Sequence, residues 1–181
     1  MRGLLALASG IDALNETIGR GVKWLVLAAT LVSATNASLR YGFDLGSNAW
    51  LELQWYLFAL IFLLGAGYTL KHNGHVRIDV LYGRYSPRGK AWVDLLGGVL
   101  FLLPVAGLMA WFGWNVFAES WAIQESSPDS GGLLRWPIKL ALPLGFGLLF
   151  LQGLAEIIKR AAMLAGHLPF ADTNEAAEEI V

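Results

Sequence analysis

Residues 71–94 read KHNGHVRIDVLYGRYSPRGKAWVD, a polar and basic stretch that separates two long apolar runs. The stretch holds five of the 13 Lys and Arg residues of the chain. In a membrane protein, short loops rich in Lys and Arg stay on the cytoplasmic side. If the flanking runs cross a membrane, the side on which this loop lies therefore sets the orientation of every other segment.

The composition favours a membrane protein over a soluble one. The 181 residues are 56% apolar and 15% charged, and the mean hydropathy is +0.53. An ordinary soluble domain has about 25% charged residues. The net charge of −1 gives no general attraction to nucleic acid, so we expect no nucleic-acid partner. The absence of cysteine excludes disulfides, thiol catalysis and cysteine-ligated metal centres.

Four apolar segments are long enough to cross a bilayer as helices. Pro137 marks the start of the last segment, and Pro104 predicts a possible kink in the third. The sequence thus predicts an all-α integral membrane protein with one four-helix domain over residues 1–165. The expected spans are 22–43, 48–70, 91–118 and 137–158. Residues 166–181 are acidic and are expected to form a flexible cytoplasmic tail.

An additional amphipathic helix is expected before the first span. Apolar side chains recur at helical spacing from Leu4 to Ile18, with Asp12, Asn15 and Glu16 on other faces. This pattern predicts a helix lying in the membrane interface, in contact with lipid. A cleaved signal peptide is the alternative, but Gly10 and Asp12 would interrupt its apolar core.

The distribution of basic residues predicts the orientation. With the loop at 71–94 in the cytoplasm, every Lys and Arg lies on the cytoplasmic side except Arg40, Arg135 and Lys139. This asymmetry places both termini in the cytoplasm.

Charged residues within the spans are the first candidates for function, because a charge in lipid is costly. Glu52, Asp94 and Lys139 lie near span ends. Glu52 and Lys139 both start spans on the outer side, so an ion pair between them, or from them to a partner subunit, is plausible. The alternative is that each side chain reaches the lipid headgroups. Glu52 also shares a helical face with small and apolar residues, which suits contact with protein: Tyr56, Ala59, Leu63 and Ala66.

The residues offer no support for an enzyme or a cofactor site. His72 and His75 lie at a span end and His167 lies in the tail, so no pair of histidines faces across two spans as a haem requires. Zinc would need further ligands near His72 and His75, where only Asp79 is available. The sequence contains no nucleophile elbow, phosphate-binding loop or His-Glu-x-x-His motif. We therefore expect no catalytic residue, no cofactor and no metal.

Several motifs resemble the small membrane subunit, of DctQ type, of tripartite ATP-independent periplasmic (TRAP) transporters. The most specific are GAGYTL at 65–70 and HVRIDVLY at 75–82. Weaker ones are WLELQW at 50–55, ESS at 125–127, and Trp136-Pro137 leading to PLGF at 143–146. The resemblance covers about residues 20–160.

This resemblance implies a scaffold subunit in the bacterial inner membrane. Its partners would be a large multi-span permease subunit, which moves an organic acid in symport with an ion, usually sodium, and a periplasmic binding protein that captures the substrate. The candidate contacts with the large subunit are Glu52, Trp55, Tyr56, His75, Arg77, Asp79, Asp94 and Lys139. The candidate docking residues for the binding protein are Arg40, Asp44, Glu125, Asp129 and Arg135.

Other functions remain open at this point. The small four-span subunit of a tripartite tricarboxylate transporter would share the topology but differ in motifs. A membrane anchor of a redox complex would need the haem ligands that are missing here. A stand-alone exporter would need an acidic residue at mid-depth, whereas Glu52 lies near the end of its span.

Overall fold

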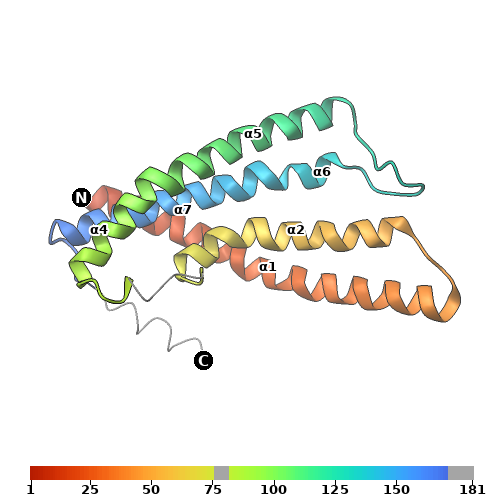
Figure 1. Cartoon of the computed structure of the whole chain (residues 1–181), viewed down its shortest axis with the longest axis horizontal. Coiled ribbons are helices and arrows are strands. Elements are labelled where there is room, and N and C mark those ends of the chain that lie inside the picture. Colours follow the sequence, from red (N-terminus) through yellow and green to blue (C-terminus); the bar gives the residue numbers. More distant parts are fainter. Residues whose placement is uncertain (76–81, 171–181) are drawn as a thin grey trace.

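A computed structural model describes residues 1–75 and 82–170 of the chain (Figure 1). Apart from an isolated bridge between Ser126 and Leu134, these residues form helices and their connections. Within this described part, four helical segments are long and apolar enough to span a membrane. Their helices are α1 (Arg2–Phe43), α2 (Asn48–Lys71), the third segment α4 (Pro87–Gly97), η1 (Gly98–Leu102) and α5 (Leu103–Ala122), and the fourth segment α6 (Trp136–Lys139) and α7 (Ala141–Leu164). The residues expected to form the end of the acidic tail, 171–181, lie outside the described part.

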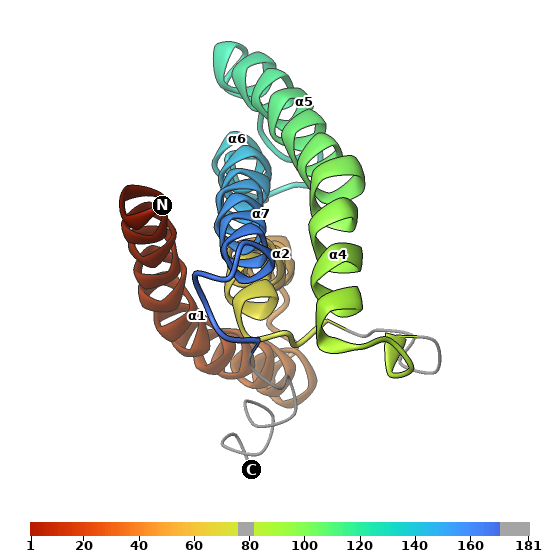
Figure 2. The same cartoon turned by 90° about the vertical axis from the view of Figure 1, so that its left-hand side faces the viewer.

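The first span and the helix expected before it form one uninterrupted helix. α1 has 42 residues, which corresponds to a length of about 63 Å. This is about twice the thickness of the hydrocarbon core, so a straight perpendicular helix would extend far beyond the bilayer. Figure 2 shows that α1 is curved. The absence of a break between the two parts differs from the separate interfacial helix that the sequence predicts, and the interfacial position stays a prediction.

The polar side of the N-terminal part of α1 faces the other helices. Asn15 is completely buried, whereas Leu4, Leu7 and Leu14 are 51%, 56% and 44% exposed. An interfacial helix would turn its polar side to water, but here that side packs against α7. The arrangement suits a lipid environment, where apolar side chains face outward and polar groups pack inside the protein.

The third span contains a turn of π-helix. The five residues of η1 lie between α4 and α5 and end two positions before Pro104, which occupies the first turn of α5. Proline has no N–H to donate and its ring crowds the carbonyl four residues earlier, and a π-turn relieves this conflict. The irregularity predicted at Pro104 is therefore present as a π-turn on its N-terminal side. Pro143 has a similar effect in the fourth span, where the helix is interrupted at Leu140.

α7 is the central helix of the bundle. It packs against α1, α2, α4 and α5, and lies between α1 and α5 in Figures 1 and 2. Small residues permit this close packing. A Cβ at Gly145 of α7 would lie 2.7 Å from the backbone oxygen of Leu63 in α2. On the other side of α7, the buried Ala106 and Gly113 of α5 face it.

Candidate functional site

Two clusters of polar side chains hold the bundle together. We name the first the loop cluster, because it fastens the connection 123–135 to α2 and α6: Glu52, Ser120, Glu125, Ser127, Arg135 and Lys139. We name the second the crossing cluster, because it lies where α1, α2 and α7 meet: Asp12, Asn15, Glu16, Lys71, His72, Gln152, Glu156 and Lys159.

Glu52 is the centre of the loop cluster. Its side chain is near the start of α2 and the residue is only 4% exposed. Its carboxylate accepts hydrogen bonds from the Leu133 backbone N–H at 2.6 Å, from the Arg135 guanidinium at 2.8 Å, and from the Ser127 hydroxyl. Three donors and one positive charge satisfy a buried carboxylate that would otherwise be strongly unfavourable. Glu52 therefore fastens the connection 123–135 to the bundle.

Neighbouring side chains complete this attachment. The Arg135 guanidinium lies over the Trp55 ring, 4.9 Å from its centroid, which is a cation–π contact. The Tyr56 hydroxyl donates to the Leu134 carbonyl at 2.8 Å. Tyr56 is buried and packs with the partly buried Ala59 and Leu63, so this part of the α2 face lies against other parts of the chain.

Lys139 pairs with Glu125 rather than with Glu52. The Lys139 ammonium donates to the Glu125 carboxylate, which also accepts a 2.6 Å hydrogen bond from the Ser120 hydroxyl. The Lys139 hydrogen bond, followed by that of Ser120, lowers the pKa of Glu125 below its usual value. The ion pair considered between Glu52 and Lys139 is thus wrong, because Arg135 lies next to Glu52 and takes its place.

Gln152 joins the helices in the crossing cluster. The residue is completely buried in α7. Its Oε1 accepts a 3.0 Å hydrogen bond from Asn15, and its Nε2 donates to Asp12 at 2.7 Å and to Glu156 at 3.2 Å. The Lys159 ammonium bridges Asp12 and Glu156. This pattern uses both donors and the acceptor of the Gln152 amide, so the rotation of α1 against α7 is specified.

Asn15 also contacts α2. A Cβ at Gly67 would overlap the Asn15 side chain, so only glycine leaves room for it. The Asn15 Oδ1 accepts no hydrogen bond from any residue in 1–75 or 82–170. A neighbouring group, Glu16, accepts from Lys71 at 2.7 Å and lies 2.9 Å from His72 Nε2, which ties the end of α2 to α1. The glycine motif at 65–70 is therefore where α2 crosses α1.

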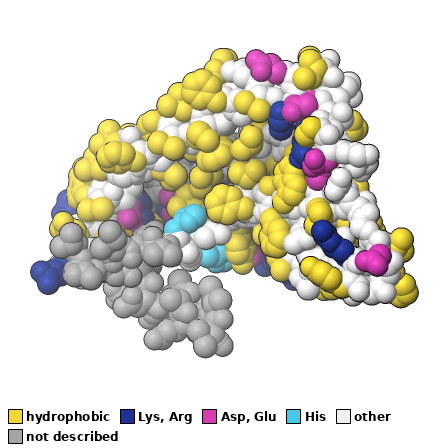
Figure 3. Space-filling view, turned by 45° about the vertical axis from the view of Figure 1, so that its right-hand side comes forward, with side chains coloured by type: hydrophobic (Ala, Val, Ile, Leu, Met, Phe, Trp, Pro, Cys, Tyr) yellow, Lys and Arg dark blue, Asp and Glu magenta, His cyan; other side chains and the backbone are white. Residues whose placement is uncertain are grey.

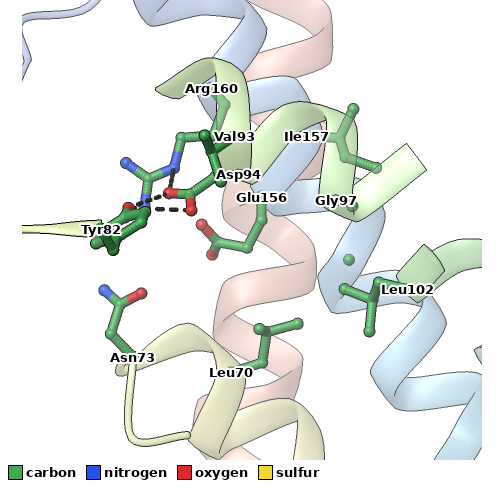
Figure 4. Close-up of a pocket in the computed structure, with 12 residues that line it drawn as sticks. Leu70, Asn73, Tyr82, Val93, Asp94, Gly97, Leu102, Glu156, Ile157 and Arg160 are labelled. Atoms are coloured by element: carbon green, nitrogen blue, oxygen red, sulfur yellow. Dashed lines mark hydrogen bonds and ion pairs between the residues drawn. The ribbon is translucent and has the colours of Figure 1, made fainter. Parts of the chain in front are cut away.

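Asp94 lies beside an open cavity of about 410 Å³ between α2, α4 and α7 (Figure 4). Its carboxylate is 3.2 Å from the Arg160 guanidinium and accepts hydrogen bonds from the Tyr82 hydroxyl at 3.0 and 2.9 Å. Asp94 thus joins α4 to α7. Glu156 of the crossing cluster lines the same cavity.

The remaining candidate residues lie at the surface or outside the described chain. His75, Arg40, Asp44 and Asp129 are exposed. Asp44 ends α1 in the left-handed conformation, with φ of 55°. Charged side chains lie toward both ends of the visible face, among them the end where the α1–α2 and α5–α6 connections lie, and many hydrophobic side chains cover the part between them (Figure 3). Arg77 and Asp79 lie outside the described residues.

The residues of the crossing cluster are absent from the sequence-based candidates. Gln152 is the one polar residue between Lys139 and Glu156, which is a usable signal that a partner side chain lies opposite it. Asn15 gives no such signal, since it sits among charged residues in a segment that resembles an interfacial helix. Ser120 and Ser127 are equally unremarkable in sequence, and only the folded connection brings them to Glu125 and Glu52.

The clusters have the chemistry of structural contacts. Among residues 1–75 and 82–170, no three His, Asp or Glu side chains are grouped so as to hold a metal ion. Carboxylates in both clusters are paired with Lys or Arg within the same chain. The arrangement can fix helices and loops in place.

Comparison with known proteins shows the family. Residues 13–163 match the family described as "Tripartite ATP-independent periplasmic transporters, DctQ component". Over 132 residues the chain is 33% identical to the C4-dicarboxylate TRAP transporter small permease protein DctQ of Rhodobacter capsulatus, covering 68% of this chain and 56% of that protein. The corresponding protein of Pseudomonas aeruginosa is 32% identical over 106 residues, 58% of this chain and 50% of its own length. The matches thus span about half the length of these relatives. No solved structure matches.

Proposed function

The chain belongs to the DctQ family of TRAP transporter components, and from this membership we propose that it is the small membrane subunit of such a transporter. In this role it supports a large permease subunit that imports an organic acid, driven by an ion gradient. A periplasmic binding protein delivers the substrate. The match over residues 13–163 carries the proposal, because it covers most of each of the four helical segments that, among the described residues, are apolar enough to span a membrane.

The bundle suits a stationary support. A permease that moves substrate by displacement of one part needs a neighbouring part that stays in place. Here α7 contacts the helices on both sides of it, and the crossing cluster specifies the rotation of α1 against α7. A bundle with closely packed small residues and with hydrogen bonds between buried side chains of different helices resists sliding of one helix past another.

The distribution of basic residues supports an orientation with both termini in the cytoplasm of a bacterium and the loop cluster on the periplasmic side. The loop cluster then presents the connection 123–135 as a fixed surface to the binding protein. Glu125 and Arg135 are held in ion pairs, so the exposed Arg40, Asp44 and Asp129 are the stronger docking candidates. Asp94 and His75, on the opposite side, remain candidates for contact with the large subunit.

The test is affinity purification of the tagged chain from membranes in mild detergent, followed by reconstitution. We expect a multi-span TRAP permease to copurify in near-equal amount. We also expect organic-acid uptake in proteoliposomes to require both chains. Recovery of the chain by itself, together with substrate flux when it alone is reconstituted, would make it the transporter and would refute the supporting role.

A further inference from the structure

The cavity beside Asp94 is polar at one end and apolar at the other (Figure 4). Tyr82 and Arg160 line the polar end, and Leu102 and Gly153 line the apolar end. Along α7, Gly153 and Arg160 are seven residues apart, which corresponds to about 10 Å. The volume of about 410 Å³ lies within the usual range of ligand sites. The cavity thus offers an amphipathic molecule both an apolar wall and charged groups.

The polar end of the cavity lies at the membrane boundary, and α2 sets this depth. The residues of α2 between Glu52 and Lys71 are uncharged and extend over about 27 Å, close to the thickness of the hydrocarbon core. The core therefore ends near Lys71, beside the cavity-lining Leu70. Trp92 of α4 is 48% exposed next to the cavity, which is typical of a residue at the boundary. A lipid headgroup would lie at this depth.

Two charged side chains of α7 have unused hydrogen-bonding capacity at the cavity. Glu156 accepts from Gln152 and Lys159 through Oε1, and no described residue donates to its Oε2. Arg160 contacts Asp94 through Nε at 3.2 Å, and no described residue accepts from its Nη2. Glu156 and Arg160 are four residues apart, so they are neighbours on one face of the helix. A negative acceptor and a positive donor are thus available side by side.

The lining also has more negative than positive charge. Its charged residues among those described are the two carboxylates of Asp94 and Glu156 and the single guanidinium of Arg160. Figure 4 shows the two carboxylates and the guanidinium on one side of the cavity, with Ile157 and Leu102 on the other. Such a lining favours a ligand that carries a cation together with an anion over a ligand that is only anionic.

We propose that this cavity binds a phospholipid with a primary amine, of the phosphatidylethanolamine class. The ammonium group donates to Glu156, and the phosphate accepts from Arg160. The beginning of an acyl chain packs against Leu70, Leu102 and Ile157. This inference concerns the membrane chain itself and is independent of the transporter role.

Other membrane lipids match the lining less well. The headgroup of phosphatidylcholine bears three methyl groups on its nitrogen, so it has no N–H to donate to Glu156. Phosphatidylglycerol is anionic and would place no cation beside the two carboxylates. A small soluble amine would leave the apolar wall of the cavity in contact with water, which is unfavourable.

Native mass spectrometry of the delipidated full-length chain in detergent tests the proposal. Dioleoyl-phosphatidylethanolamine, -phosphatidylcholine and -phosphatidylglycerol are added at equal concentrations. We expect about tenfold tighter binding of the first, the discrimination that one hydrogen bond to a charged group provides. Glycerophosphoethanolamine, which is the headgroup without acyl chains, should bind much more weakly.

Glu156→Gln tests the charge. Lys159 keeps its ion pair with Asp12 in this variant, so the helices should stay joined. The preference for phosphatidylethanolamine over phosphatidylcholine should disappear, whereas binding of phosphatidylcholine should not change. Glu119→Gln, at an exposed position outside the cavity, is the matched control and should keep the preference.

Gly97→Leu tests the place. Gly97 lines the cavity and a Cβ there would meet no atom within 4 Å, so a leucine occupies space without a clash at Cβ. It should lower binding of phosphatidylethanolamine about tenfold, to the level of the other two lipids. Gly21→Leu in α1 is the matched control, because a Cβ at that glycine also meets no atom. Melting temperatures in detergent check that each variant folds.

Three results would overturn the proposal. The first is equal binding of the three lipids to the unaltered chain. The second is an undiminished preference in a folded Glu156→Gln or Gly97→Leu variant, which would place the lipid elsewhere on the surface. The third is equally tight binding of glycerophosphoethanolamine, which would identify a site for a soluble amine. None of these results alters the copurification that tests the supporting role.

Discussion

Asn15 of α1 donates a 3.0 Å hydrogen bond to Gln152 of α7, and the two completely buried side chains lie 137 positions apart in the chain. The bond joins the N-terminal part of the chain to the last span at the point where Gly67 of α2 leaves space for the Asn15 side chain. Three helices thus meet at one polar contact, which orients α1 from within the bundle.

Gly67→Ala should destabilise the bundle. The added Cβ would overlap Asn15, and overpacking of this kind costs about 1–3 kcal/mol. The apparent melting temperature in detergent, followed by the fluorescence of the eight tryptophans, should fall. Gly147→Ala is the matched control, because a Cβ there meets no atom within 4 Å.

A second substitution checks that Asn15 is the cause. The double variant Gly67→Ala with Asn15→Ala removes the overlapping side chain, so it should regain part of the stability lost in Gly67→Ala. Equal stability of the Gly67→Ala and Gly147→Ala variants would show that α1 and α2 leave enough space at Gly67 for an added Cβ.

Glu52→Ala should release the connection 123–135 from α2. The substitution leaves the Leu133 N–H and the Arg135 guanidinium without their buried acceptor. Removal of one partner of a buried ion pair costs about 3–5 kcal/mol, so hydrogen exchange of amides in this connection should accelerate at least tenfold. Asp129→Ala, at an exposed position of the same connection, should leave exchange nearly unchanged. Unaltered protection of the Leu133 amide in Glu52→Ala would contradict the attachment of this connection through Glu52.

Because of the Glu125–Lys139 pair, the stability of the folded chain should fall as the pH is lowered into the acid range. The pKa of Glu125 is lowered from 4.5 in the folded protein, chiefly by the Lys139 hydrogen bond. The folded state therefore gains stability that is fully present above pH 4.5 and is lost as the pH falls through the lower, folded pKa. Melting temperatures measured in detergent from pH 7 to pH 3 should decrease less in Glu125→Gln than in the unaltered chain. If the melting temperatures of the two proteins decrease equally, Glu125 is not the cause of the pH dependence.

Labelling of single cysteines should reveal the orientation. The chain contains no cysteine, so Ser130→Cys and His75→Cys each introduce a unique thiol at an exposed position. In cells with a permeable outer membrane, an impermeant maleimide should label Ser130→Cys and should reach His75→Cys only after the inner membrane is disrupted. The reverse pattern would invert the proposed topology.

Local properties of the sequence were sufficient for much of the fold. Among the described residues, four helical segments are long and apolar enough to span a membrane, as the sequence predicts, because the length of an apolar run can be read without knowledge of its neighbours. The position of a proline also predicts a local irregularity in a helix, and a π-turn is indeed found before Pro104. The partners of individual charged side chains could not be predicted from the sequence in the same way. The sequence analysis singled out Glu52 as a charged residue within a span and left open whether it pairs or reaches the headgroups. In the structure it is buried and its partner is Arg135, which lies at the end of the connection 123–135.

By itself, then, the sequence determined an all-helical chain with four apolar segments and the family to which it belongs. Only the tertiary structure decided that α1 is a single helix whose polar side faces α7, and that Lys139 pairs with Glu125. The physical reason is that hydrophobicity and helical periodicity are carried by neighbouring residues in the chain. The choice of a polar partner depends instead on the rotation and register of whole helices, and these are set where glycines such as Gly67 and Gly145 let distant backbones approach.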